Sequence, residues 1–321
     1  MIFLYMKREF SYDTFHSDAN RIYRVYRIEY NPDGSIVNRT NETPEPLGAA
    51  ILEDFPELDK AIRMESWGPY HYIKSADRSL EQQILFADPG LFTEFDFPLV
   101  YGSKQNVFAD QNSIVLTESA ARKYFGSTDV LGKSIQVRLH EDFEDFLVSG
   151  VAHDPPVNSS LQFEVVVSFD RMLKTFPWTK RDVGDWGSSG YKTYVKSREP
   201  LDVDALEDRL FDFFHTRHGW EASMRDDGTW KGEHHPFRYG LMPLKEIHTA
   251  PFLPEFTTVP VDPFNVQMLV LIAVMILLIA CFNFAILSVG RAGNRSREIG
   301  LRKTIGAIDR QIRFQFWSES L

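Results

Sequence analysis

MLVLIAVMILLIACFNFAIL, residues 268–287, decides the architecture of this chain. Its twenty residues include one strongly polar side chain, that of Asn283. Because a helix rises about 1.5 Å per residue, the stretch spans about 30 Å, the thickness of the hydrocarbon core of a bilayer. A buried helix of a soluble protein seldom stays apolar on every face over this length. The stretch therefore predicts a transmembrane helix, which we bound at residues 266–289.

The residues after this helix indicate its orientation. Residues 291–321 hold seven basic and three acidic side chains, whereas the chain of 321 residues has a formal net charge of −10. Basic residues beside a span stay in the cytoplasm. We therefore expect residues 290–321 in the cytoplasm and the acidic residues 7–265 outside the cell membrane.

Composition excludes several classes of protein. With 43% hydrophobic and 25% charged residues, the bulk of the chain is neither disordered nor a multi-span membrane core. Its acidic balance leaves no basic face of the kind that a nucleic-acid binder needs. The single cysteine, Cys281, excludes an intrachain disulfide and a cysteine-based zinc site.

The N-terminal residues 1–6, MIFLYM, are followed directly by Lys7 and Arg8. They are too short for the apolar region of a signal peptide, although residues 7–265 must be exported. We interpret them as the outer end of a first transmembrane helix that begins outside this sequence, the alternative being an ordinary buried strand or helix end. The helical pattern at the other end reaches Leu321 without a stop signal, so the chain is expected to be a fragment.

Between residues 7 and 265, short helical and strand patterns alternate. Thr117 and Asp202 are the expected N-caps of the last two helices, and Gly126 and Gly219 their expected stops. The predicted helices are residues 10–19, 46–54, 117–125 and 203–217. The predicted strands are residues 22–30, 61–66, 113–116, 135–139, 146–152, 163–167 and 192–195. The expected fold is an α+β extracytoplasmic domain, followed by a transmembrane α-helix and a cytoplasmic amphipathic helix.

Two glycine-rich stretches match catalytic or phosphate-binding motifs only in part. In GSTDVLGKS, residues 126–134, five residues separate the glycines instead of four, and a predicted helix precedes the stretch instead of a strand. In WGSSG, residues 186–190, the spacing of a nucleophile elbow is not met. Both are predicted to be turns, and the acidic residues 141–145 an exposed strand end. The chain is therefore not expected to be an enzyme.

Histidines gather toward the end of the exported part. His215 and His218 lie three residues apart in a predicted helix, and Glu233, His234 and His235 follow in a polar stretch. These are zinc-ligand types, but there is neither a His-Glu-x-x-His motif nor a cysteine partner. We interpret them as solvated side chains, and assign no metal, catalytic or cofactor-binding residue.

The tail carries a second helical pattern. Apolar residues recur every three or four positions, at Leu301, Ile305, Ile308, Ile312 and Phe316, and basic residues occupy much of the rest. This pattern predicts an amphipathic helix at the inner membrane surface. Such a helix contacts either the lipid bilayer or a groove of a partner protein.

The tail motif also resembles a known family. REIGLRKTIGA, residues 297–307, followed by QFWSESL, is similar to the segment after a transmembrane helix in MacB-like/FtsX-like ABC transporter permeases, and LLIACFNFAILSVGRAGNRS resembles the span itself. The exported part resembles the MacB-like extracytoplasmic core domain, especially that of long permeases common in Bacteroidetes. The stretches that carry this resemblance are residues 10–25, 85–102, 113–135, 147–168 and 243–249.

The resemblance implies an order of domains in a bacterial inner membrane. Residues 1–6 would be the remnant of a first transmembrane helix, and residues 7–265 the MacB-like periplasmic core domain. Residues 266–289 would be the second transmembrane helix, and residues 290–321 a cytoplasmic coupling segment that starts the FtsX-like domain. The family also has three spans after the exported domain, so most of the transmembrane machinery is absent here.

The resemblance further implies a function. The chain would be a permease subunit that couples ATP hydrolysis by a separate ABC ATPase to a conformational change of the exported domain, for export or mechanotransmission. ATP would bind the ATPase and no cofactor this chain; the substrate is not indicated. By motif match, the ATPase contact would be formed by Glu298, Gly300, Arg302, Lys303 and Gly306.

The basic residues and the glycines of this motif have a physical rationale, and the charges also have an alternative. Arg302 and Lys303 suit acidic groups on the ATPase, and Gly300 and Gly306 permit close backbone approach. The alternative for the charges is a positive anchor at the inner membrane surface. Asn283 is expected to bond either to a partner helix, from the remaining spans or a second permease copy, or to its own helix backbone.

Two other classes of function remain. A single-span sensor with an extracytoplasmic ligand-binding domain would need a signalling module after the span. A membrane-anchored enzyme would need a nucleophile and a base, which the sequence does not reveal.

Overall fold

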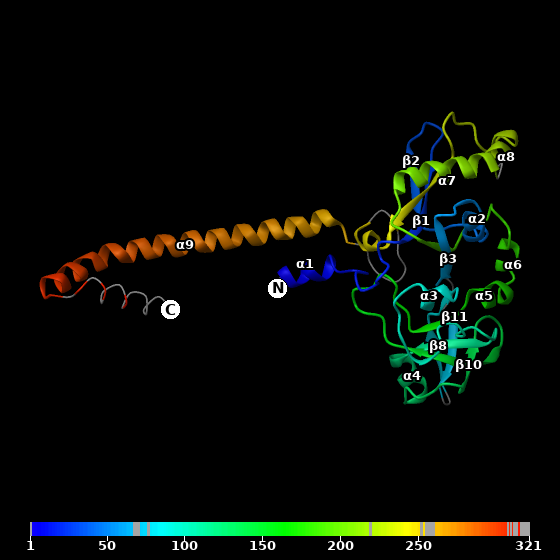
Figure 1. The fold of residues 1–321 in the computed structure, drawn as a ribbon, viewed down its shortest axis with the longest axis horizontal. Coiled ribbons are helices and arrows are strands. Elements are labelled where there is room, and N and C mark those ends of the chain that lie inside the picture. Colours follow the sequence, from blue (N-terminus) through cyan, green and yellow to red (C-terminus); the bar gives the residue numbers. More distant parts are fainter. Residues whose placement is uncertain are drawn as a thin grey trace. The chain divides into compact units, whose positions relative to one another are not determined.

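The computed structural model describes residues 2–66, 71–75, 78–217, 220–250, 253, 261–306, 308, 310 and 314. The chain divides into two compact units (Figure 1). Met6–Asp262 forms the first, called the sheet unit below. Met1–Tyr5 and Pro263–Leu321 form the second, called the helical unit, and each is described by itself.

The strands of the sheet unit join into one mixed sheet. Among the described residues, thirteen strands pair in the order β13-β1-β12-β3-β6-β11-β8-β10-β9-β4-β5, with β2 on β1 and β7 on β10. The strands are β1 (Ile22–Tyr30), β2 (Ile36–Thr40), β3 (Leu58–Glu65), β4 (His71–Ser75), β5 (Arg78–Gln82), β6 (Leu85–Ala87), β7 (Leu99–Gly102), β8 (Ser113–Thr117), β9 (Ser134–Arg138), β10 (Phe143–Ala152), β11 (Val165–Ser168), β12 (Lys192–Ser197) and β13 (Phe237–Pro243).

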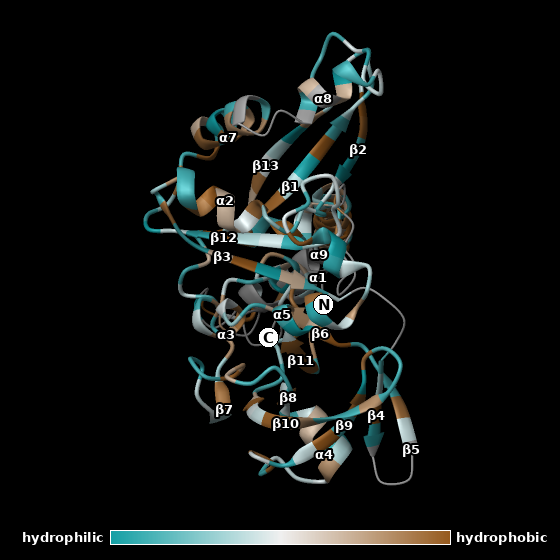
Figure 2. Ribbon diagram, turned by 90° about the vertical axis from the view of Figure 1, so that its right-hand side faces the viewer, coloured by the Kyte–Doolittle hydropathy of each residue, from teal (hydrophilic) through white to brown (hydrophobic). Residues whose placement is uncertain are grey.

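The middle of this sheet is its most apolar part. β11 pairs in parallel with β6, and β8 pairs in parallel with β10, whereas the other strand pairs are antiparallel. All residues of β8 and β11 are buried, and β11 is brown, the hydrophobic colour, in Figure 2. Strands covered on both faces need such continuous apolar runs. The Val165–Val167 run therefore sits in the interior.

Helices flank the sheet at several places. Figure 1 shows α7 and α8 near β1 and β2 at one end of the sheet unit, and α4 near β8 and β10 at the other. The helices are α1 (Ile2–Glu9), α2 (Leu47–Asp54), α3 (Gly90–Thr93), α4 (Glu118–Phe125), α5 (Phe169–Thr175), α6 (Thr179–Asp182), α7 (Val203–Arg217), α8 (Trp220–Asp226), the 3-10 helix η1 (Leu244–Thr249) and α9 (Pro263–Thr304).

The predicted helix caps are confirmed where the structure describes them. The Thr117 hydroxyl accepts a hydrogen bond from the Ala120 N–H at 3.2 Å, and Gly126 ends α4 with a left-handed φ of 73°. Asp202 accepts from the Ala205 N–H at 3.3 Å at the start of α7. Gly219 lies outside the described residues.

One predicted helix, at residues 10–19, is wrong. The chain there forms successive turns, and Asp13 has a φ of 54°. Its N–H donates to the Asn158 carbonyl at 2.9 Å, and its carboxylate accepts from the Ser160 N–H at 2.9 Å. These contacts with a distant segment replace the hydrogen bonds of a helix.

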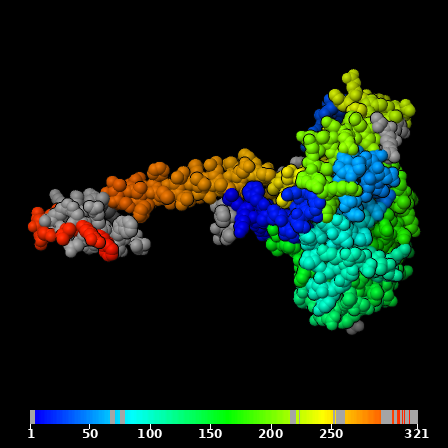
Figure 3. Space-filling view, viewed as in Figure 1, coloured from blue at the N-terminus to red at the C-terminus, as the bar shows by residue number. Residues whose placement is uncertain are grey.

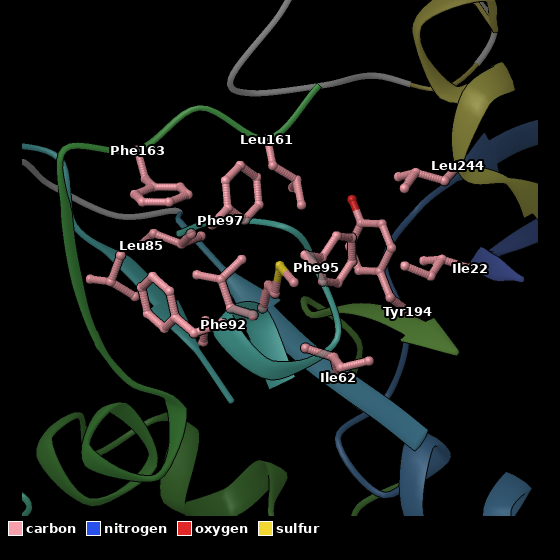
Figure 4. Packing of buried hydrophobic residues seen from close by; sticks show 14 of the residues in the cluster. Ile22, Ile62, Leu85, Phe92, Phe95, Phe97, Leu161, Phe163, Tyr194 and Leu244 are labelled. Atoms are coloured by element: carbon pink, nitrogen blue, oxygen red, sulfur yellow. The ribbon is translucent and has the colours of Figure 1, made fainter. Parts of the chain in front are cut away.

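The core of the sheet unit is rich in aromatic side chains. Figure 4 shows ten labelled members of its central cluster, including Phe92, Phe95 and Phe97, each at most 1% exposed. Phe97 packs edge to face on Phe163, with ring centroids 5.0 Å apart. On the face of the sheet unit in Figure 3, light-blue, cyan and green segments lie next to one another. The α+β fold expected from the sequence is confirmed.

Candidate functional site

The apolar stretch of residues 268–287 lies in α9. Residues Pro263–Gly290 form the one helix in the described part of the chain that is long and apolar enough to cross a membrane, with a mean hydropathy of 3.0 in its most apolar window. None of that window is buried. Leu277 is 64% exposed and Phe284 73% exposed. Apolar surface of this extent requires a cover from outside the chain.

The helix continues beyond the apolar stretch. The sequence predicts a span that ends near residue 289 and a separate helix from Leu301, whereas α9 is unbroken as far as Thr304. Residues 290–304 contain no proline, so nothing in the backbone stops the helix there. Glu298, Gly300, Arg302 and Lys303 therefore share the helix of the span.

The helix ends just before Gly306. The Ile305 N–H donates to the Leu301 carbonyl at 3.3 Å, and the Thr304 hydroxyl donates to the same carbonyl at 2.6 Å. Gly306 has a φ of 97°, a conformation that residues with a β-carbon avoid. The glycine at position 306 is thus also explained by the backbone conformation, because it allows the chain to turn after α9.

The apolar residues of the tail pattern are exposed where they are described. Leu301 and Ile308 are each 65% exposed, and Ile305 is 80% exposed. Ile312 and Phe316 lie outside the described residues. Asn283 is exposed within the apolar part of α9, so its amide is accessible to another helix.

A buried hydrogen-bonded pair, which the sequence analysis missed, joins the two ends of the sheet unit. His248 Nε2 lies 2.7 Å from Glu9 Oε2, and the side chains are 3% and 7% exposed. Tyr12 stacks on the His248 ring at a centroid distance of 3.4 Å. Glu9 ends α1 and His248 belongs to η1, so the pair connects segments 239 residues apart. In the sequence, PLKEIHT, residues 243–249, carries a family resemblance but no local signal for this contact.

Polar groups next to this pair hold the turn at Asp13 in place. Burial raises the pKa of the Asp13 carboxyl, and hydrogen bonds from Ser160 and Ser159 oppose that rise. The Asp13 carboxylate accepts from the Ser160 N–H, and the Asn158 side chain donates to the Ser11 carbonyl at 2.8 Å. These contacts fasten the segment after α1 to the loop that precedes β11.

The glycine-rich stretches are turns, as predicted. In residues 126–134, Gly126 and Gly132 have φ angles of 73° and 77°, and the Gly132 N–H donates to the Val148 carbonyl at 2.8 Å. This turn leads from α4 into β9, the reverse of the order in a phosphate-binding loop. In residues 186–190, the Gly187 N–H is bound by the Asp185 side chain at 2.8 Å.

The histidine-rich region has a different arrangement from the expected one. His215 and His235 come together with Glu221, a residue that the sequence analysis did not consider, and their ligand atoms lie within 4.8 Å of one another. Glu233 and His234 are not in this group, and His218 lies outside the described residues. The residues between α7 and β13 therefore contain a candidate cation site.

Comparison with known proteins identifies the class of protein. Residues 1–212 match the family model of the MacB-like periplasmic core domain, and residues 270–321 match that of the FtsX-like permease C-terminal region. The first match covers more than half of the chain, and the chain therefore belongs to the MacB-like periplasmic core domain family. No curated protein matches the chain.

Several solved structures are similar to this chain. A domain of a protein described as a permease from Porphyromonas gingivalis has a TM-score of 0.59 and 23% identity, covering 79% of this chain and 98% of its own. The periplasmic region of MacB from Actinobacillus actinomycetemcomitans has a TM-score of 0.44 and 15% identity, covering 71% and 91%. The extracellular domain of the ABC-type transporter YknZ from Gram-positive bacteria has a TM-score of 0.41 and 14% identity, covering 69% and 99%. The first likeness shows the α+β fold.

Family membership and the apolar helix together define a membrane protein, a component of an ABC transporter permease. Permeases of this family typically work with an ABC ATPase.

Proposed function

We propose that this chain couples an ABC ATPase in the cytoplasm to movement of the sheet unit outside the membrane, for export or mechanotransmission. The observation that carries this proposal is the length of α9, which runs unbroken over 42 residues. At about 1.5 Å per residue the helix is about 63 Å long, about twice the hydrocarbon core of a bilayer. A single rod can carry a displacement from one side of the membrane to the other.

The proposed placement follows the charges. The seven basic residues after residue 290 favour a cytoplasmic tail, so residues 290–321 form the coupling segment and 266–289 the span. Residues 7–265 then face the periplasm, and residues 1–6 are the end of another span. Asn283 bonds to a helix from the remaining spans or from a second permease copy, because an amide in lipid needs a partner.

The proposed ATPase contact lies at the cytoplasmic end of α9. Glu298, Arg302 and Lys303 fall in its last two turns, and the chain turns at Gly306. The exposed Leu301 and Ile305 offer apolar surface beside these charges. Opposite charges on the ATPase would orient the contact, and the apolar residues would supply most of its affinity.

On the periplasmic side, the Glu9–His248 pair supports transmission into the sheet. Glu9 ends α1, and His248 lies in η1, which directly follows β13. β13 pairs with β1 over seven residues, from Tyr23 to Glu29. A displacement of α1 or of η1 would therefore be shared by both elements and passed through β13 to the sheet.

The test is a double charge reversal, Arg302→Glu with Lys303→Glu, in the full-length permease reconstituted with its ATPase. Stimulation of ATP hydrolysis by the permease should fall by about 5- to 150-fold, the range of typical coupling energies of 1–3 kcal/mol. Membrane insertion, measured by fractionation, should be unchanged. The matched control is Arg291→Glu with Arg295→Glu, which changes the same charge nearer the span and should affect stimulation less.

Three outcomes would contradict the proposal. Unchanged ATPase stimulation in the first variant would remove the assigned contact. Equal loss in both variants would indicate a general positive anchor at the membrane surface. A chain that stimulates no ATPase would favour the single-span sensor.

A further inference from the structure

The group of His215, Glu221 and His235 has the composition of a transition-metal site. His215 lies in the last turn of α7, Glu221 in the first turn of α8, and His235 just before β13. Two imidazoles and one carboxylate are the protein ligands of a common open zinc site. The chain therefore folds three ligand types from three segments into one place.

The ligand atoms converge on one carboxylate oxygen. His235 Nδ1 lies 2.6 Å from Glu221 Oε2, and His215 Nδ1 approaches the same oxygen. The two imidazole rings are 4.3 Å apart between centroids. Both ring nitrogens of His215 are buried, and the groups that face the ring are the Glu221 carboxylate and the backbone of Phe237. The two imidazoles therefore share one carboxylate oxygen.

The surroundings hold Glu221 in place from the other side. Arg225 Nε donates to Glu221 Oε1 at 2.9 Å, which leaves Oε2 directed at the two histidines. Arg225 also donates to the Gly232 carbonyl at 2.7 Å, and Trp230 Nε1 donates to the His234 carbonyl at 2.7 Å. These contacts fix the loop that carries His235. Such outer contacts are what orient metal ligands in proteins.

The site is closed on one side and open on the other. The His215 and Glu221 side chains are 10% and 9% exposed, whereas that of His235 is 48% exposed. The Phe211 ring packs against both imidazoles, and its centroid lies 4.2 Å from that of the His215 ring and 4.6 Å from that of the His235 ring. A bound ion would thus have three protein ligands and a fourth position facing water.

We propose that His215, Glu221 and His235 bind one divalent transition-metal ion of the zinc class. Zinc bonds of about 2.0–2.2 Å in a tetrahedron place the ligand atoms about 3.3–3.6 Å apart, so the Glu221 oxygen must separate from both imidazole nitrogens by about 1 Å. His235 is the exposed ligand and lies outside helix and strand, so it can move outward with little change in packing, and a rotation of the Glu221 carboxylate would provide the separation from His215. The ion would tie the end of α7 to α8 and to the start of β13, independently of the proposed coupling to an ATPase.

The experiment uses the full chain in detergent, stripped of metal by a chelator and titrated with ZnCl₂ in a calorimeter. Wild-type protein should bind one Zn²⁺ per chain, and His235→Ala should weaken binding by about tenfold or more. Because His235 is half-exposed, its removal leaves the core intact. Glu221→Gln should weaken binding similarly, and Zn²⁺ should raise the unfolding temperature of the wild type but not of His235→Ala.

His153→Ala is the matched control. His153 pairs with Glu118 at 2.9 Å on the surface, and its side chain is 54% exposed, but it belongs to no group of three ligands in the described residues. This variant should bind Zn²⁺ as the wild type does. Equal affinity in wild type and His235→Ala, or equal weakening in His153→Ala, would overturn the proposal, since the three residues would then form only an ion-pair cluster.

Discussion

Aromatic side chains in the sheet unit and in α9 have opposite exposures. Phe92, Phe95 and Phe97 in the sheet unit are at most 1% exposed, whereas Phe282 and Phe284 in α9 are 67% and 73% exposed. The same residue type is covered by its own chain in one region and left bare in the other. Since exposed apolar surface is costly in water, the two regions fold in different solvents.

Because of this difference, the two regions are stabilised by different interactions. The stability of the sheet unit comes from its internal packing, which can be disrupted at single residues. The stability of α9 comes from its backbone hydrogen bonds and from the lipid or helices around it. Matched substitutions in the two regions should therefore have unequal effects.

The largest expected effect is that of Phe97→Ala. This substitution leaves a cavity beside Phe163 and should lower the free energy of unfolding of the sheet unit by about 3–5 kcal/mol. Phe284→Ala should change it by less than about 1 kcal/mol, since no packing is lost within the chain. Denaturant unfolding of the full chain in detergent, followed by tryptophan fluorescence, measures both. Equal losses of unfolding free energy in the two variants would contradict the proposed difference between the two regions.

A charge introduced into α9 should have a larger effect than the same charge introduced on the surface of the sheet unit. Leu277→Arg, near the middle of the candidate span, should cost about 2.5–3.5 kcal/mol of membrane insertion. Val157→Arg places the same charge on a residue of the sheet unit that is 74% exposed, and it should leave insertion and folding unchanged. The measurement is the fraction of chain that resists alkaline extraction from membranes. Full insertion of Leu277→Arg would argue against a lipid-facing or helix-packed span.

Acid should destabilise the sheet unit by a smaller amount. Burial lowers the pKa of His16 from 6.5 to about 4, and its Nδ1 accepts a hydrogen bond from the Asp96 N–H at 3.0 Å. The unfolded chain then binds the proton more readily, so the stability present above pH 6.5 is lost as the pH falls toward 4. Between pH 7 and pH 5, protonation linked to His16 should lower the free energy of unfolding by about 2 kcal/mol.

The variant His16→Gln isolates this contribution. Between these two pH values, its free energy of unfolding should fall by about 2 kcal/mol less than that of the wild type. Denaturant unfolding at both pH values measures this difference. His153→Gln, at an exposed position, should behave as the wild type. The helical signal of α9, which contains no histidine, should not change with pH. An identical pH dependence in His16→Gln and wild type would refute the assignment.

The sequence alone determined the features that depend on local pattern. The apolar run of residues 268–287 specified a membrane helix, because length and hydropathy suffice for that inference. Strand β1 and the caps Thr117, Gly126 and Asp202 follow from neighbouring residues, and they were predicted correctly. The family was likewise evident from the tail motif.

The tertiary structure decided what depends on distant segments. The turns at residues 10–19 replace a predicted helix because Asp13 bonds to Asn158 and Ser160. The Glu9–His248 pair and the group around Glu221 arise only when the chain brings remote side chains together. Short-range periodicity carries no information on such contacts, whose energies come from burial in a shared interior.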